Sequence, residues 1–475
     1  MIKEFFKNSL IYIVGTIVTR GIGILLVPIY TRYLSPSDYG IIDLFTIVAS
    51  IINITIALEI SQAIARYYQD AKGDLQKALY TSTAFWFTFV VYGAYCIVSL
   101  IFSDIFTTLL LDDSKYKDIF ILATFSIATN GIFYFTQNQL KWQIQPKDSI
   151  YASLLNIVIV VVVAVLLLTN SQLKIESIFI AQILGNVIAS LLAIYYAINS
   201  YKFLFDYKKL KEMISFSTPL VLSGVAIFIA MYIDRIAIKD LLGFNDLGIY
   251  GVAYRFSSVA GLVMIGFQNS ITPLIFKNYN NNNTPREIST IFDIFSIFAL
   301  LTICGSIIFS KEILILFTTP NFYNASQLIG LLVMISFFSN MYIFAPGITI
   351  AKKTKYVIYI TITIALLNIF LNYTLIPIFG LVGSAYATLI GSIVGFFMYC
   401  FISYRFYPIP YSTKRLLISF AIVLTSSYFI ENILNKIDIY SIIAKLFYFI
   451  CLSLILVFLL YSKTNLKYNI FAKRS

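Results

Sequence analysis

Residues 34–41 read Leu-Ser-Pro-Ser-Asp-Tyr-Gly-Ile, and residues 242–249 read Leu-Gly-Phe-Asn-Asp-Leu-Gly-Ile. Both stretches share the skeleton L-x-x-x-D-x-G-I, and each lies between two long apolar segments. A motif that returns once, in the same setting, indicates a chain built from two similar halves.

A second pair of similar stretches supports this duplication. The sequence reads AQILGNVI at 181–188 and ATLIGSIV at 387–394. From the glycine of the first motif to the glycine of the second there are 145 residues in the first half (40 to 185) and 143 in the second (248 to 391). Internal duplication of an apolar chain is typical of transporters, whose substrate path lies between the repeats.

The composition places the chain in a membrane. Hydrophobic residues make up 59% of it and charged residues only 12%, with a mean hydropathy of +0.86. Histidine is absent, which excludes histidine bases, proton relays and metal ligands. The four cysteines lie singly in apolar segments, and no phosphate-binding loop occurs, so we expect no metal site and no cofactor. The net charge of +12 fits basic cytoplasmic loops better than nucleic-acid binding.

Apolar runs long enough to cross a bilayer recur along the whole chain. Because a crossing needs roughly 20 apolar residues, the pattern predicts an all-α polytopic membrane protein with about 14 transmembrane helices. The expected spans are 8–33, 40–67, 78–102, 119–140, 150–169, 177–198, 214–238, 248–276, 289–309, 326–350, 357–377, 382–403, 416–431 and 441–461.

Lysine and arginine gather in alternate loops, on the side of the N-terminus. By the positive-inside rule, this bias places both termini in the cytoplasm. We expect one six-helix lobe over 1–205, a second over 206–405, and two further helices with a cytoplasmic tail over 406–475. Six helices is an even number, so both lobes enter the membrane from the same side and form a parallel repeat.

Several basic residues lie within the expected spans, where charge is costly and usually faces a wet interior. Arg20 lies near mid-bilayer in the first span, where it could bind an anionic substrate group or make a structural ion pair. Arg255 lies about two turns into span 248–276. For Arg235, next to Asp234, snorkelling to the interface is a competing interpretation.

Two other sets of polar residues are candidates. Glu59 could bind a coupling proton or sodium ion, or could pair with Arg66 or Arg20. Asp234 is a second candidate for ion coupling. Four polar residues lie on one helix face of span 119–140 and just beyond its inner end: Asn130, Tyr134, Gln137 and Lys141. They could line a cavity or form hydrogen bonds between helices.

Two of these regions resemble a known family. The stretch GTIVTRGIGILLVPIYTRYLSPSDYGIIDLF (15–45) resembles the start of Wzx-type polysaccharide flippases. These belong to the multidrug/oligosaccharidyl-lipid/polysaccharide exporter superfamily. The stretch YIDRIAIKDLLGFNDLGIYGVAYRF (232–256) resembles that family's helix 7–8 region.

The resemblance, which covers roughly 1–405, implies two lobes of the multidrug-exporter type around a central cavity. It implies transport of undecaprenyl-diphosphate-linked oligosaccharide from the inner to the outer leaflet of the bacterial cytoplasmic membrane, by alternating access, for O-antigen, capsule or exopolysaccharide assembly. Polysaccharide polymerase machinery would be a partner. Arg20 and Arg255 match the positions of cavity arginines in the related lipid II flippases.

Two alternatives remain. The first is an ion-coupled multidrug exporter on the same scaffold, against which the several arginines argue. The second is a membrane enzyme that polymerises lipid-linked sugars, which would need a catalytic outer loop; the longest outer segments, 103–118 and 310–325, are short. A major-facilitator transporter is disfavoured because residues 65–77 lack its G-x-x-x-D-[RK] motif.

Overall fold

The computed structural model describes residues 26–353, 355–434 and 438–461, and these form helices with no strand among them. Within these residues, twelve helices are long and apolar enough to cross a membrane. The predicted fold class, an all-α polytopic membrane protein, is therefore confirmed. The described chain divides into two compact units, Met1–Tyr232 and Ile233–Ser475, whose boundary lies inside one long helix.

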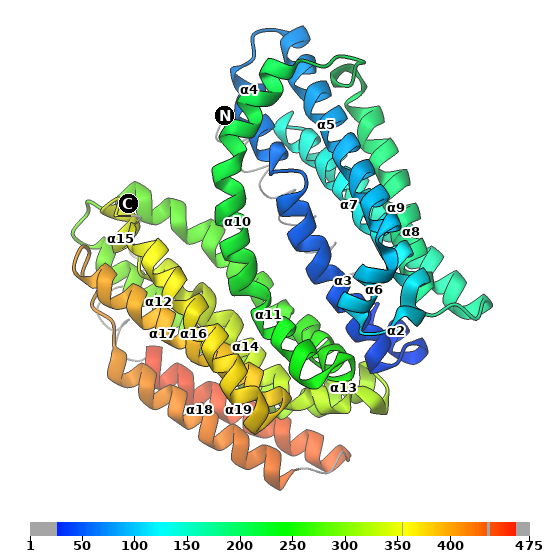
Figure 1. Ribbon diagram of the computed structural model, residues 1–475. Helices are drawn as coiled ribbons and strands as arrows, with labels where there is room; N and C mark the ends of the chain where they lie inside the picture. The colour runs from blue at the N-terminus through cyan, green and yellow to red at the C-terminus, as the bar shows by residue number, and fades with distance from the viewer. Residues whose placement is uncertain (1–25, 354, 435–437, 462–475) are drawn as a thin grey trace. The chain divides into compact units, whose positions relative to one another are not determined.

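The helices of the first unit, up to and including the one that crosses the boundary, are α2 (Val27–Tyr33), α3 (Pro36–Thr55), α4 (Ile60–Asp70), α5 (Asp74–Ile101), α6 (Ser103–Leu111), η1 (Ser114–Tyr116), α7 (Lys117–Trp142), α8 (Pro146–Asn170), α9 (Ile175–Tyr196), η2 (Ile198–Ser200) and α10 (Tyr207–Leu242). Within this unit α8 lies along α9, and α7 packs against both α9 and α5 (Figure 1).

The second unit continues with α11 (Phe244–Asn278), α12 (Thr284–Ile308), α13 (Ser310–Phe317), η3 (Pro320–Ala325), α14 (Ser326–Asn340), η4 (Met341–Phe344), α15 (Gly347–Ile350), α16 (Lys355–Phe379), α17 (Leu381–Tyr404), α18 (Thr413–Ile433) and α19 (Ile439–Tyr461). Here α16 lies along α17, and α14 packs against α11 and α17. The described helices account for thirteen of the expected spans. Most of the expected span 8–33 lies outside the described residues.

Two expected spans are interrupted. The continuous helix predicted over 40–67 is wrong, because Leu58 and Glu59 both have φ of +50° and separate α3 from α4. Left-handed backbone cannot continue a right-handed helix. The span predicted over 326–350 passes from α14 through the 3₁₀ turn η4 and resumes at Gly347 after Pro346, since proline has no N–H to donate and restricts the residue before it.

The repeated L-x-x-x-D-x-G-I motif marks the start of a helix in each half. In the first copy Ser35 caps α3: its hydroxyl accepts from the backbone N–H of Asp38, whose carboxylate accepts from the N–H of Ser35. In the second copy Gly243, with φ of +89°, precedes α11, and Asp246 lies in its first turn. An acidic residue there interacts favourably with the helix dipole.

The structure extends the repeat to segments expected to be outer loops. Between α5 and α7 lie the short helix α6 and the 3₁₀ turn η1, and between α12 and α14 lie α13 and η3.

The second pair of similar stretches, 181–188 and 387–394, includes a glycine at a close contact between helices of the first half. A Cβ at Gly185 would come within 2.6 Å of the Val160 side chain of α8, so α8 and α9 approach one another closely there.

The C-terminal helix pair is attached to the second unit. Helices α18 and α19 pack on α12 around a buried apolar cluster that includes Cys304, Val423 and Leu456. Lys445 of α19 is buried and forms an ion pair with Glu312 of α13. A buried charge without its partner would be strongly destabilising, so this pair favours one position of α19 on the unit.

Candidate functional site

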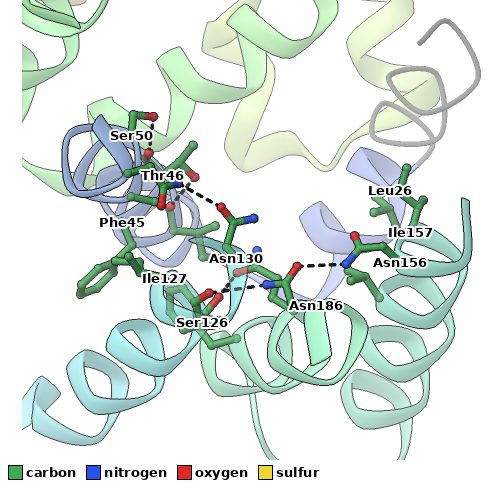
Figure 2. A pocket seen from close by; sticks show the side chains of 16 residues that line it. Leu26, Phe45, Thr46, Ser50, Ser126, Ile127, Asn130, Asn156, Ile157 and Asn186 are labelled. Atoms are coloured by element: carbon green, nitrogen blue, oxygen red, sulfur yellow. Dashed lines mark hydrogen bonds between the residues drawn. The ribbon is translucent and has the colours of Figure 1, made fainter. Parts of the chain in front are cut away.

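A cavity of about 380 Å³ lies inside the first unit, walled by α3, α7, α8 and α9 (Figure 2). Its described lining contains amides and hydroxyls but no charged residue. The polar residues that line it are Thr46, Ser50, Asn53, Ser126, Asn130, Asn156, Gln182 and Asn186. Since α3, α7, α8 and α9 are all candidate membrane spans, this is a polar surface at a depth where lipid would otherwise exclude polar groups.

On one side of the cavity, amides join α3 to α5 and α7. The Asn53 side-chain nitrogen donates to Asn130 Oδ1 over 3.1 Å. The Tyr92 hydroxyl donates to Asn53 Oδ1 over 2.6 Å. Both polar ends of the Asn53 amide are therefore used, which holds this side chain in one orientation.

On the opposite side, amides join α9 to α7 and α8. The Ser126 hydroxyl donates to Gln182 Oε1 over 2.7 Å, and Asn156 Nδ2 donates to Asn186 Oδ1 over 2.9 Å. Hydrogen bonds of this kind stabilise helix contacts in membranes by about 1 kcal/mol each. They also fix the shape of the cavity wall.

A much smaller cavity adjoins the first and contains Glu59. Its lining includes Asn53, Tyr92 and Tyr134, so Asn53 belongs to both cavities. Within the described part of the chain, Glu59 has no basic group at ion-pair distance, and Arg66 pairs instead with Asp70 at 2.8 Å. The pairing of Glu59 with Arg66 considered above does not occur.

The predicted polar stripe on α7 separates into different roles. Asn130 lines the larger cavity and Tyr134 the smaller one. Gln137 donates instead to Ser153 of α8, and Lys141 donates to Asn138 on its own helix over 2.9 Å. Only the first two residues of the stripe therefore line a described cavity.

In the second unit, the structure brings Asp234 and Arg235 of α10 against two tyrosines of α11. The Tyr250 hydroxyl donates to Asp234 Oδ2 over 2.5 Å. The Arg235 guanidinium lies 4.0 Å from the centre of the Tyr254 ring. Arg235 is only 5% exposed, so it does not snorkel to an interface within this unit.

The other two candidate arginines are Arg255 and Arg20. Arg255 follows Tyr254 on α11 and is partly buried. It therefore lies on the same helix as the two tyrosines that contact Asp234 and Arg235. Arg20 lies outside the described residues.

Of the eight polar residues that line the larger cavity, only Asn130 was expected from the sequence; the amides of Asn53, Asn156, Gln182 and Asn186 were not. Asp43, which is buried in α3, was not expected either. These residues lie among apolar neighbours in long spans, with Asp43 and Asn53 both on α3 and Gln182 and Asn186 both on α9. The one available signal was the spacing of four between Gln182 and Asn186, which places both on the same helix face.

Comparison with known proteins identifies the family. The model of a family described as "Polysaccharide biosynthesis protein" matches residues 5–279, more than half of the chain. The chain belongs to this polysaccharide biosynthesis family. A second family model, MatE, matches residues 219–374. The resemblance to Wzx-type flippases of the multidrug/oligosaccharidyl-lipid/polysaccharide exporter superfamily is thereby confirmed.

Curated relatives of this family member include two bacterial proteins. A Shigella flexneri protein named "Putative O-antigen transporter" is 23% identical over 80% of this chain and 93% of its own length. A Haemophilus influenzae protein named "Lsg locus putative protein 1" is 24% identical over 58% of this chain and 66% of its own length.

Solved structures show the same fold. A lipid II flippase in an inward closed conformation superposes with a TM-score of 0.74 and 18% identity, covering 95% of this chain and 99% of the flippase. An inward-facing multidrug transporter of the MATE family superposes with a TM-score of 0.66 and 17% identity, covering 81% of this chain and 94% of the transporter. This family member is thus a multi-pass membrane protein of the superfamily that includes polysaccharide flippases and multidrug transporters.

Proposed function

We propose that the chain is a flippase that moves undecaprenyl-diphosphate-linked oligosaccharide from the inner to the outer leaflet of the bacterial cytoplasmic membrane. The product would serve assembly of O-antigen, capsule or exopolysaccharide. The observation that carries the proposal is the hydrogen-bonding cavity enclosed by apolar spans of the first unit, in a member of the polysaccharide biosynthesis family. The Shigella flexneri relative, by its name, points to the same kind of cargo.

The energetics of lipid-linked sugars require such a cavity. Moving one hydroxyl from water into alkane costs about 4–8 kcal/mol, so an oligosaccharide faces a barrier on the order of tens of kcal/mol in bare lipid. A path lined by amides and hydroxyls replaces the lost hydrogen bonds, while the prenyl tail stays in lipid. An inside-negative potential also favours outward movement of the diphosphate, by about 2.3 kcal/mol per charge per 100 mV.

Arginines are the candidate ligands of the diphosphate. A guanidinium offers planar, paired donors to phosphate oxygens, which a lysine ammonium cannot do. We propose Arg20 and Arg255 as the principal ligands. Arg235 is a further candidate, and its stacking on Tyr254 restricts where its guanidinium can point.

Binding and flipping of a defined lipid-linked oligosaccharide in proteoliposomes test the proposal. We expect each of Arg20→Ala and Arg255→Ala to weaken substrate binding about ten- to a hundredfold, because charge-assisted hydrogen bonds contribute about 1.5–3 kcal/mol each. The double variant should not flip the lipid. Arg66→Ala is the matched control, because its ion pair with Asp70 is exposed and contributes little.

Wild-type flipping by a folded double variant would exclude this diphosphate site. Failure of the wild-type protein to flip any lipid-linked oligosaccharide would instead reject the flippase assignment. In that case an ion-coupled exporter becomes the better assignment, a role that the MatE match would suit, as would Glu59, which has no ion-pair partner among the described residues.

A further inference from the structure

We infer that the cavity of the first unit is the binding site for an uncharged sugar ring of the transported lipid rather than for its diphosphate. This inference rests on the proposed function and makes it more specific. The chemical class is a neutral hexose or N-acetylhexosamine. The inference is carried by the hydrogen-bonding atoms of the cavity wall that remain available.

Two amide nitrogens and one amide oxygen on the wall are not used by other described residues. Asn130 accepts from Asn53 through Oδ1, and its Nδ2 donates to no described group. Gln182 accepts from Ser126 through Oε1, which leaves its Nε2 available. Asn156 uses Nδ2 to reach Asn186, which leaves Oδ1 available.

Bonding between helices uses only one of the two polar atoms, nitrogen or oxygen, of each of these amides. A polar contact that merely joins two helices needs one donor and one acceptor and no open volume beside them. Here the three amides belong to residues of α7, α8 and α9 that line a cavity of about 380 Å³. Figure 2 shows Asn130, Asn156 and Asn186 around this space. Amide groups without partners are costly inside a bilayer unless a ligand or water bonds to them.

The available atoms match a sugar in kind. Sugar hydroxyls both donate and accept, and an N-acetyl carbonyl accepts, so two N–H donors and one acceptor can be satisfied together. The apolar part of the wall, which includes the partly exposed Ile157 and Val160, offers a surface for the C–H face of the ring. The volume lies at the small end of the roughly 300–1,000 Å³ range of small-molecule sites, which suits a sugar ring rather than a complete lipid-linked repeat unit.

The charge of the wall excludes the anionic parts of the substrate. No described lining residue is charged, so a phosphate or carboxylate held here would lose its hydration without gaining a cation. The cavity should therefore favour a neutral ring over a uronic acid.

Binding of three defined lipids to purified full-length protein tests the inference. The probes are undecaprenyl diphosphate carrying one N-acetylglucosamine, the same lipid carrying one glucuronic acid, and bare undecaprenyl diphosphate. The test variants are Gln182→Met and Asn130→Leu, which keep the side-chain size and remove the available N–H donors. Gln139→Met is the matched control, since Gln139 is buried outside the cavity and donates to Thr81 of α5.

We expect each test variant to bind the N-acetylglucosamine lipid about two- to tenfold more weakly, the loss expected for one hydrogen bond. Binding of bare undecaprenyl diphosphate should not change, and the control should bind all three lipids like wild type. The wild-type protein should bind the glucuronic acid lipid more weakly than the N-acetylglucosamine lipid.

Other outcomes separate the two proposals. If the wild-type protein binds both sugar lipids equally, or if both folded variants bind the N-acetylglucosamine lipid like wild type, the sugar site is rejected and the flippase assignment stands. Equal weakening toward bare and glycosylated lipid would mean that the cavity holds the diphosphate, which also rejects the inference. If the wild-type protein neither binds nor flips any of the three lipids, both proposals are rejected.

Discussion

At the scale of single residues, the Glu59 carboxylate lies in a small cavity that shares Asn53 with the larger polar cavity. It lies at the break between α3 and α4 and lines the small cavity together with Tyr92 and Asn53. Tyr92 bonds to Asn53, and Asn53 bonds to Asn130 in the wall of the larger cavity. A proton or sodium ion bound at Glu59 would therefore share the small cavity with Tyr92 and Asn53, whose hydrogen bonds lead on to Asn130.

This arrangement predicts that Glu59 contributes to ion coupling. We expect Glu59→Gln to make transport in proteoliposomes insensitive to imposed proton and sodium gradients, because the amide keeps the shape of the side chain and loses its charge. Glu176→Gln is the matched control, since Glu176 accepts a backbone hydrogen bond at the exposed start of α9. If Glu59→Gln responds to gradients like wild type, Glu59 is structural.

At the scale of helices, the ends of several elements depend on left-handed residues. Helix α7 ends at Trp142, and Ile144, two residues later, has φ of +58°. The N–H of the next residue, Gln145, donates back to the carbonyl of Leu140. Glycine normally occupies this position, because a Cβ there costs roughly 1–2 kcal/mol. Ile144 is also 65% exposed, so little burial offsets that cost.

Replacing this isoleucine by glycine should stabilise the protein. We expect Ile144→Gly to raise the free energy of unfolding by about 0.5–1 kcal/mol, the relief of strain less the added freedom of glycine in the unfolded chain. Gly380→Ala should have the opposite effect, because Gly380 has φ of +59° before α17. Thermal unfolding in detergent measures both, and a lower melting temperature for Ile144→Gly would contradict the strain argument.

At the scale of the whole molecule, the duplication determines topology. The motif copies at 34–41 and 242–249 begin α3 and α11, which correspond in the two halves. Six expected spans separate the two copies, so both should face the same side of the membrane. With both termini in the cytoplasm, as the distribution of lysine and arginine predicts, that side is the outside.

Labelling of engineered cysteines tests this topology. In a variant in which the four native cysteines are replaced, Ser37→Cys and Asn245→Cys should both react from outside the cell with an impermeant thiol reagent. Asn245 is exposed and Ser37 partly exposed, so both positions are accessible. Reaction of only one of them from outside would contradict the parallel repeat.

Features with local causes could be predicted from the sequence. The length of each apolar run predicts a helix that crosses a membrane, and twelve such helices are present within the described residues. The repeated motif predicts related helix starts, because Asp38 and Asp246 act on the first turn of their own helices. The position of the charged Arg235 within a span also indicated either a wet interior or snorkelling to the interface, but not its contact with Tyr254.

Features that depend on which helices become neighbours were decided only by the tertiary structure. Asn130 and Gln137 lie on the same face of α7, yet one lines a cavity and the other bonds to α8. Helical periodicity specifies a direction around one helix, but the element that lies in that direction depends on the packing of the whole unit. The sequence alone determined a duplicated, helical membrane protein. The packing of α3, α7, α8 and α9 decided which amide side chains surround the cavity. The physical reason is that hydrogen-bond partners depend on distances between helices, which no single segment encodes.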